Sequence, residues 1–288
     1  MIHWYTSQTP SRGTCFSLSG RPTAAGLTNA RFPAIPDPVL WAQARFKWQP
    51  DPIQAEILRT TANRLMLCCT RQWGKSTVTA LKALHHAWYH PGSLVIVAAP
   101  TARQSGEWIE KTTALLRQLD VSPRGDGRNR NSILLPNRSR IVGLPGVGAN
   151  VRGFSRVSLL ILDEAAFVPD PLYHALNPML AVSGGALWLM STPNGQSGFF
   201  YNEWHSAESV WQRTRIPAAQ CPRIAPAFLA GQRITLGDQI YRQEYECEFL
   251  STGTQVFSQE LLQQSFDELY DPTNGGQPLW TSTDRSNN

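Results

Sequence analysis

The 288 residues of this chain are enough to bury a full hydrophobic core, and the length allows one large domain or two small ones. An apolar content of 42% with 16% charged residues is typical of a globular protein and excludes wholesale disorder. The net charge is +5, and all but four of the 26 basic residues are Arg. Because Arg binds phosphate in a bidentate manner, this bias favours a nucleic-acid partner, although a G+C-rich genome would explain it equally well.

The sequence divides into three parts. Residues 1–38 are rich in Ser, Thr, Pro, Gly and Arg without periodicity, and we expect them to form a flexible N-terminal segment. Residues 39–255 carry the periodic elements and are predicted to form one domain. Residues 256–288 are predicted to be a linker and an irregular C-terminal tail.

Apolar strands and helical patterns alternate through the central part of the chain. In the first half the pattern predicts two helical pieces within 39–60, a strand at 64–69, a helix from 76 to about 90, a strand at 93–99 and a helix at about 103–119. In the second half it predicts a hairpin of 132–135 and 139–144, a strand at 157–162, a helix near 172–180, strands at 186–190 and within 209–216, and a helix at 236–249. This alternation indicates an α/β fold with a mainly parallel central sheet flanked by helices.

The segment after the strand at 64–69 has the pattern of a phosphate-binding loop. Gly74, Lys75 and Ser76 match the end of G-x-x-x-x-G-K-[ST], whereas Cys69 replaces the first Gly. A helix that begins here directs free backbone N–H groups and the positive end of its dipole toward a bound phosphate. The residues predicted to hold the phosphates are Thr70, Arg71, Gln72, Trp73, Gly74, Lys75, Ser76 and Thr77. An exposed turn is the alternative if the G-K-S tripeptide is taken alone.

Two adjacent carboxylates, Asp163 and Glu164, end the hydrophobic strand at 157–162. In an open parallel sheet, ligands bind beyond the carboxyl ends of the strands, where both acids are expected to emerge. Asp163 is predicted to hold Mg²⁺ together with Ser76, and Glu164 to orient and deprotonate the attacking water. The alternative is an ordinary helix N-terminus, where acids are also common.

A third strand, at 186–190, runs into small polar residues. Ser191, Thr192 or Asn194 could contact the terminal phosphate or sense its loss, although Pro-Asn-Gly at 193–195 is also ordinary turn chemistry. We expect all three strands to deliver their polar residues to the same edge of the sheet.

In their order and in their residues, the motifs resemble those of the ATPase domain of phage terminase large subunits, the motors that package DNA into capsids. The resemblance covers about residues 45–260. It is carried by Asp51–Gln54, Thr70–Ser76, Pro100–Gln104, Val151–Ser155, Asp163–Asp170, Ser191–Pro193, Gly198–Trp204 and Tyr241–Phe249. It implies a P-loop NTPase fold of the ASCE, RecA-like type.

The resemblance also implies roles for single residues. Gln54 stands at the position that reads adenine, and Arg71 at the position of an arginine that contacts phosphate in the deviant loop of the family. Arg71, Lys75 and Glu164 would then form the catalytic set. Ser191 and Thr192 would couple hydrolysis to movement.

The function implied by the resemblance is Mg²⁺-dependent ATP hydrolysis that drives double-stranded DNA into a capsid. The implied partners are duplex DNA, a small terminase subunit, the portal protein and further copies of the chain in a ring on the portal. A basic cluster could line the DNA path, or could be no more than a soluble loop; its members are Arg124, Arg128, Arg130, Arg138 and Arg140. Arg152 could contact nucleotide in a neighbouring subunit or DNA, or could simply be solvated.

The chain departs from the family in one respect. Large terminases carry an RNase H-like nuclease domain after this region, and such a domain needs several carboxylates around a two-metal centre. Beyond Phe257 the sequence has five acids, and none follows a clear strand, so we expect the chain to be truncated before that domain and to lack nuclease activity. A nucleotide-binding remnant with weak catalysis and a helicase-like translocase are the alternative functions.

The five cysteines are odd in number and lack C-x-x-C spacing, which argues against a disulfide framework and a zinc site. No apolar run approaches membrane-spanning length, and the N-terminus lacks the charged and apolar regions of an export signal. These features suit a reducing cytoplasm and predict no membrane partner, and the resemblance implies the cytoplasm of the bacterial host.

Overall fold

The computed structural model describes residues 35–145, 153–208 and 210–251. Most of the predicted N-terminal segment, all of the predicted C-terminal tail and Arg152 therefore lie outside the described residues. The statements below concern the described part of the chain.

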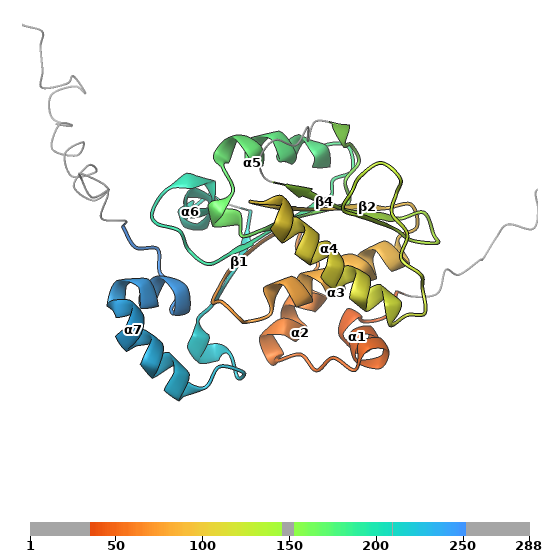
Figure 1. The fold of residues 1–288 in the computed structure, drawn as a ribbon. Helices are drawn as coiled ribbons and strands as arrows, with labels where there is room; N and C mark the ends of the chain where they lie inside the picture. Colours follow the sequence, from red (N-terminus) through yellow and green to blue (C-terminus); the bar gives the residue numbers. More distant parts are fainter. Residues whose placement is uncertain (1–34, 146–152, 209, 252–288) are drawn as a thin grey trace, which may run out of the picture. The chain divides into compact units, whose positions relative to one another are not determined.

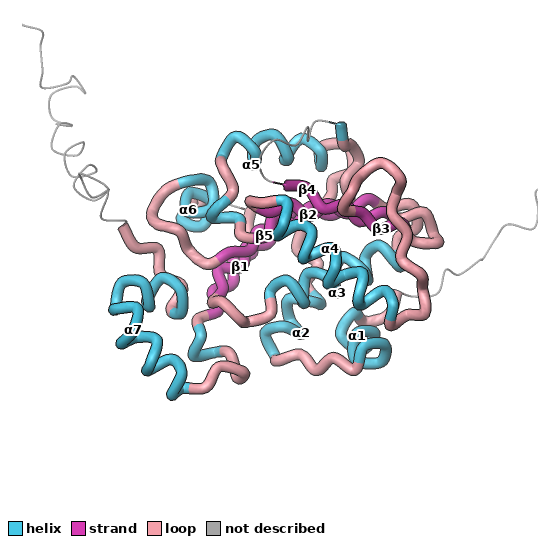
Figure 2. The backbone as a smooth tube through the Cα atoms, viewed as in Figure 1, coloured by secondary structure: helices cyan, strands magenta, loops and turns pink. Residues whose placement is uncertain are grey.

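The fold contains a seven-stranded sheet with the strand order β3-β4-β2-β5-β6-β1-β7. Figure 2 shows the strands at the centre of the fold with helices around them. Its strands are β1 (Arg64–Cys69), β2 (Leu94–Ala99), β3 (Ser132–Leu134), β4 (Arg140–Pro145), β5 (Leu159–Asp163), β6 (Ala186–Ser191) and β7 (Gln212–Ile216). Within this sheet the β3–β4 pair is antiparallel, and every other neighbouring pair is parallel. The predicted mainly parallel sheet and the hairpin are thus confirmed.

Helices cover both faces of the sheet (Figure 1). One face packs against α1 (Pro38–Phe46), α2 (Pro52–Arg59), α3 (Lys75–Tyr89) and α4 (Ala102–Arg117). The other face packs against α5 (Asp170–Leu176), the short 3₁₀ helix η3 (Asn177–Leu180) and α6 (Gly198–His205). Strand β1 shows why both faces are apolar: Leu65 and Leu67 belong to one core cluster, and Met66 and Cys68 to the other.

The three strands that carry the predicted motifs are neighbours in the order β5-β6-β1. Because they are parallel, their carboxyl ends lie at the same edge of the sheet. Strand β5 pairs with β6 on one side and with β2 on the other. Because α4 follows β2, the start of α4 lies next to the end of β5. The predicted common edge is therefore confirmed.

Local sequence signals set the helix starts around this edge. Helix α2 begins with a capping box of Asp51 and Gln54, and α4 begins with a capping box of Thr101 and Gln104. Helix α3 begins differently, because Gly74 takes a left-handed conformation and no side chain caps the helix among the described residues. Within the described part of the chain, the N–H groups of Lys75 and Ser76 therefore have no side-chain cap.

The helix predicted at 236–249 needs correction. Helix α7 spans Pro226–Tyr245, so it begins about ten residues earlier than predicted, and it ends before the coil at 246–251. Gly237, with φ 74°, interrupts the helix. The helical turns before this break have no clear apolar period in the sequence, so they were not predicted. Strand β7 lies within the predicted range of 209–216, and α6 was not predicted from the periodicity.

Gly143 lets α4 pack closely on β4. A Cβ built on Gly143 would lie 2.8 Å from Cγ1 of Ile109 and 3.2 Å from the backbone oxygen of Ser105, both on α4. Such distances are shorter than normal van der Waals contacts, so any larger residue would push the helix outward. The glycine thus helps to place the start of α4 beside the end of β5.

We predict that Gly143→Ala lowers the free energy of unfolding by about 1–3 kcal/mol, because the added methyl overpacks the contact with α4. Gly231→Ala is the matched control, since no atom lies within 4 Å of the added Cβ in α7. The control is expected to be neutral or to stabilise by up to about 1 kcal/mol. Urea denaturation measures both variants, and equal stability of the two would contradict the close packing.

His86 of α3 links the helix to β2 through Ser158, the residue before β5. Its Nε2 lies 2.9 Å from Oγ of Ser158, whose hydroxyl donates to the backbone oxygen of Leu94. Because that hydroxyl has a single hydrogen, Nε2 of His86 must be the donor to it. Burial, followed by the charges of His90 and Lys82, lowers the pKa of His86 from 6.5 to about 4.

We predict that the protein loses stability relative to His86→Gln as the pH falls from about 6.5 to 4. The unfolded chain takes up a proton on His86 in this window and the folded chain does not, so protonation favours unfolding. The difference should reach about 2–3 kcal/mol, and glutamine keeps an N–H donor without titrating. Parallel pH profiles of the two proteins in urea denaturation would contradict the assignment.

Candidate functional site

The loop from Thr70 to Gly74 joins β1 to α3 at the common edge of the sheet. Gln72 and Gly74 both have positive φ, at 64° and 98°, which turns the chain sharply into the helix. A Cβ on Gly74 would lie 2.9 Å from Nε2 of Gln54, so the loop is also packed closely against α2. A loop of this shape at an uncapped helix N-terminus is suited to bind an anion.

The ammonium group of Lys75 meets the acids at the end of β5. Its Nζ lies 2.7 Å from Oε1 of Glu164, and both side chains are largely buried, at 12% and 25% exposure. The neighbouring hydroxyl of Ser76 donates to Oδ2 of Asp163 over 3.3 Å. The four groups, predicted from segments about 90 residues apart, therefore converge at one place.

Burial and charge act together on these groups. Burial raises the pKa of Asp163 to about 6, with Glu164 adding to the rise and Lys75 opposing it. Burial alone would lower the pKa of Lys75, but its neighbours, Cys69 first and then the two carboxylates, give a net rise. Lys75 is therefore protonated and positively charged. A further cation beside Asp163 would favour the ionised form of that acid.

Glu164 is held in a rare backbone conformation. Its φ and ψ are 54° and 46°, in the left-handed region, and its N–H donates to Oδ1 of Asp163 over 3.0 Å. Non-glycine residues in this region concentrate at functional sites. Oγ of Ser191, at the end of β6, lies 3.5 Å from Oε2 of Glu164, and Thr192 is buried beside it. Glu164 thus lies between Lys75 and Ser191.

Two cavities of about 350 Å³ each are lined by these residues and their neighbours. One is lined by Arg71, Gln72, Lys75, Gln104, Glu164 and Phe167. The other is lined by Ser76, Arg103, Gln104, Glu107, Trp108, Lys111, Asp163 and Glu164. Gln104 and Glu164 line both, so together the cavities offer space for a ligand across the end of β5.

Arg71 does not point freely into the site. Its Nε lies 2.6 Å from Oε2 of Glu244 on α7, and the Arg71 side chain is 63% exposed. Oγ1 of Thr70 donates to the backbone oxygen of Glu244 over 3.1 Å. Two loop residues are therefore attached to the end of α7, a connection that the sequence pattern did not reveal.

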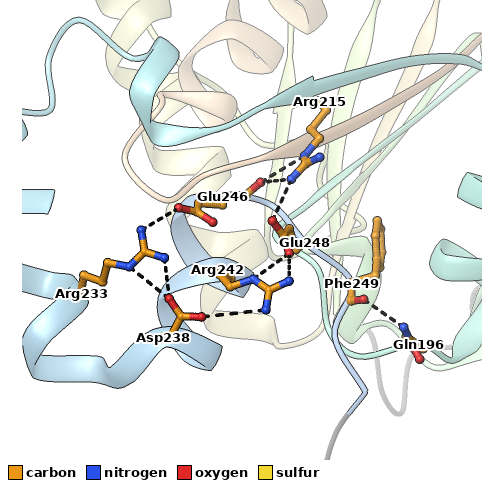
Figure 3. Close-up of polar contacts among 8 residues, drawn as sticks. All are labelled: Gln196, Arg215, Arg233, Asp238, Arg242, Glu246, Glu248 and Phe249. Carbon is orange, nitrogen blue, oxygen red and sulfur yellow. Dashed lines mark hydrogen bonds and ion pairs between the residues drawn. The ribbon is translucent and has the colours of Figure 1, made fainter. Parts of the chain in front are cut away.

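The end of α7 is itself fixed to the sheet by ion pairs (Figure 3). Arg215 of β7 donates to the backbone oxygen of Glu246 and pairs with Glu248. Arg242 pairs with the same Glu248, and Arg233 pairs with Asp238 and Glu246. Because β7 pairs with β1, this network places Glu244 beside the loop that follows β1.

The side chain of Gln54 contacts the loop between β1 and α3. Its Oε1 accepts from the N–H of Asp51, and its Nε2 donates to the backbone oxygen of Trp73 over 2.8 Å. Arg223 donates to the same oxygen of Trp73 and pairs with Asp51 at 3.1 Å. The proposal that Gln54 reads a base stays a prediction; in this structure its amide supports the loop.

The ring of Trp73, a residue predicted to hold phosphate, is fully buried in the core. Trp73 belongs to the site through its backbone. Sequence reasoning missed Arg223, Glu244 and Gln104 as site residues. Gln104 and Glu244 lie in segments that carry the resemblance, and Gln104 also shows the T-x-x-Q capping pattern at the start of a helix, but neither was assigned a role.

The basic cluster lies elsewhere, at the β3 edge of the sheet. Arg124 and Arg138 line a cavity of about 500 Å³ there, and Arg140 pairs with Asp126 at 3.4 Å. A role in binding DNA stays a prediction. Among the described residues, no group of three or more His, Cys, Asp or Glu side chains is placed to hold a metal, and no helix is long and apolar enough to span a bilayer.

The strand order, the phosphate loop and the acids at the end of β5 define a P-loop NTPase fold. The family model described as "Terminase large subunit, T4likevirus-type, N-terminal" matches residues 66–264. The chain belongs to this family of terminase large subunits, and its sequence-based resemblance is confirmed.

Relatives and solved structures agree with this assignment. The large terminase subunits of Thermus virus P23-45 and Thermus phage G20c are each 27% identical over 258 residues, which covers 73% of this chain and 51% of theirs. The chain thus spans about half the length of these curated relatives.

The large terminase ATPase domain of Thermus phage P74-26 matches with a TM-score of 0.63 and 25% identity, covering 74% of this chain and 99% of that domain. The large terminase of bacteriophage HK97 matches with a TM-score of 0.55 at 16% identity, covering 68% of this chain and 49% of that one, and supports the fold alone.

Proposed function

We propose that this domain binds ATP and hydrolyses it to ADP and phosphate. The observation that carries the proposal is the convergence of Lys75, Ser76, Asp163 and Glu164 at one edge of the sheet. The large terminase of a thermophilic bacteriophage, similar in fold, was solved with ADP and with ATP-γ-S. The same edge of this chain offers the cavities for such a ligand.

The triphosphate takes the first N–H groups of α3 and the ammonium of Lys75 as its partners. Lys75 is paired with Glu164 at 2.7 Å, so the β- and γ-phosphates replace that carboxylate when ATP binds. This exchange frees Glu164 at the moment when a base is needed. Lys75 thus has one partner before ATP binds and another afterwards.

The oxygen ligands suit Mg²⁺. The hydroxyl of Ser76 and the carboxylate of Asp163 are hard oxygen donors close to each other, and these two residues would hold Mg²⁺. When bound, the ion would neutralise charge on the phosphates. Burial raises the pKa of Asp163, and a divalent cation beside it favours the ionised acid, so binding of the ion and ionisation of Asp163 support each other.

Glu164 acts as the base. The oxygen of water attacks the γ-phosphorus, the bond to the β–γ bridging oxygen breaks, and that oxygen leaves with the electron pair as part of ADP. Glu164 accepts a proton of the water, which then passes to the products or solvent. Ser191 contacts Oε2 of Glu164 and holds the carboxylate in place; with Thr192 it would sense the loss of the terminal phosphate.

Arg71 supplies a second positive group. To reach phosphate it must leave Glu244, which pairs with it at 2.6 Å. An arginine on the transferring phosphate is worth on the order of 10³–10⁵ in rate. Gln54 is proposed to recognise the base; because its amide is buried and bonded to Asp51 and Trp73, base binding requires the amide to leave these partners.

Membership of the family supports the wider role of the whole protein. We propose that hydrolysis drives duplex DNA into a capsid, with the portal protein, a small terminase subunit and further copies of this chain in a ring as partners. This role places the protein in the cytoplasm of the bacterial host. A catalytically weak remnant and a helicase-like translocase are separated from it by the assay below.

We predict that the purified protein releases phosphate from ATP with Mg²⁺, and that duplex DNA stimulates the rate more than single-stranded DNA. Lys75→Ala should abolish both nucleotide binding and turnover, because the phosphates lose their cation. Glu164→Gln should abolish turnover and keep ATP binding. Glu110→Gln, on the exposed face of α4, is the control for an acid-to-amide change.

Phosphate release and ATP binding are measured on samples whose folding is checked by circular dichroism. A folded wild-type protein that binds ATP without turnover would favour the remnant. Stimulation by single-stranded DNA alone would favour the helicase-like alternative. Full activity of Glu164→Gln would contradict the assignment of the base.

A further inference from the structure

Gln104 occupies a position that the proposed reaction has not yet used. It lies in the first turn of α4, which follows β2, and β2 pairs directly with β5. Ser191 approaches the end of β5 from the opposite side, on β6. Gln104 and Ser191 therefore flank Glu164 from two sides.

The capping box fixes the orientation of the Gln104 amide. Oε1 of Gln104 accepts from Oγ1 of Thr101 at 2.8 Å and from the backbone N–H of Thr101 at 3.2 Å. Because a backbone N–H can only donate, the oxygen of the amide must face it. The nitrogen of the amide therefore faces away from the cap.

This nitrogen has no hydrogen-bond partner within residues 35–145, 153–208 and 210–251. Gln104 lines both cavities beside Glu164, and its oxygen is already engaged by Thr101. What the side chain offers to the cavities is a pair of N–H donors. The close approach of α4 at Gly143 limits how far these donors can move.

We propose that Nε2 of Gln104 donates a hydrogen bond to the γ-phosphoryl group of ATP as water attacks it. Negative charge on the transferring group lies on its equatorial oxygens, and a fixed donor stabilises that charge without reorganisation. Gln104 keeps its hydrogens throughout, so the bonds made and broken are those of the proposed hydrolysis. The inference rests on the proposed ATPase function and adds a catalytic donor to it.

The test separates the donor from the helix cap. Gln104→Met removes both the donor and the cap interaction without adding charge, whereas Thr101→Val removes the hydroxyl of the cap and keeps the amide. Gln104→Glu keeps the capping box and removes the donors. For each protein the maximal rate of phosphate release, the affinity for ATP-γ-S and the melting temperature are measured.

We expect Gln104→Met and Gln104→Glu to lower the maximal rate by on the order of 10²–10³-fold, the typical effect of losing one preorganised donor. Gln104→Met should keep its affinity for ATP-γ-S within a few-fold of wild type. Thr101→Val should lose as much melting temperature as Gln104→Met but less than tenfold in rate.

A rate for Gln104→Met within threefold of wild type would overturn the proposal, as would equal losses of rate in Gln104→Met and Thr101→Val. Either result, with an active wild type, leaves the proposed ATPase function standing. Absence of turnover in the folded wild type would instead refute that function, and the role of Gln104 with it.

Discussion

The buried ion pair between Lys75 and Glu164 is the interaction on which the site depends. A buried ammonium is strongly unfavourable unless it is paired, and the 2.7 Å contact supplies the partner. The pair joins the start of α3 to the end of β5, and Ser76 and Asp163 make a second link between the same two places. The strand order β5-β6-β1 makes both contacts possible.

The same pair explains why the site is suited to a triphosphate. Lys75 and the two acids together carry an excess of negative charge when all are ionised. Burial raises the pKa of Asp163, and the charge of Lys75 opposes this rise more strongly than that of Glu164 adds to it. Phosphate groups can replace Glu164 as the ionic partner of Lys75, and Mg²⁺ can bind the carboxylate of Asp163. The groups of the site are thus held in mutual contacts that a nucleotide and its metal ion would replace.

Much of this fold could be predicted from the sequence, because short local patterns of residues specify most of its strands and helices. Strand β1 was predicted with its bounds, since a run of apolar residues before a Gly-Lys-Ser loop has few other interpretations. The acids at the end of β5 were placed correctly because parallel strands bring their ends to one edge. The later helix was misplaced, because α7 has mostly exposed residues and a break at Gly237.

The contacts between distant segments could not be predicted in this way. Glu244 lies 173 positions from Arg71, and Arg223 lies 150 positions from Trp73. No period or motif specifies such pairs, because they depend on how α7 and the sheet are placed together. The orientation of the Gln104 amide was likewise hidden until the cap and the strand order were known.

The central claim is that phosphate displaces Glu164 from Lys75. The most direct measurement is a crystal structure of this protein with Mg²⁺ and a non-hydrolysable ATP analogue. The account predicts that Nζ of Lys75 lies within hydrogen-bond distance of the β- and γ-phosphates and has separated from Glu164. A nucleotide bound in the loop with the pair between Lys75 and Glu164 still at 2.7 Å would contradict it.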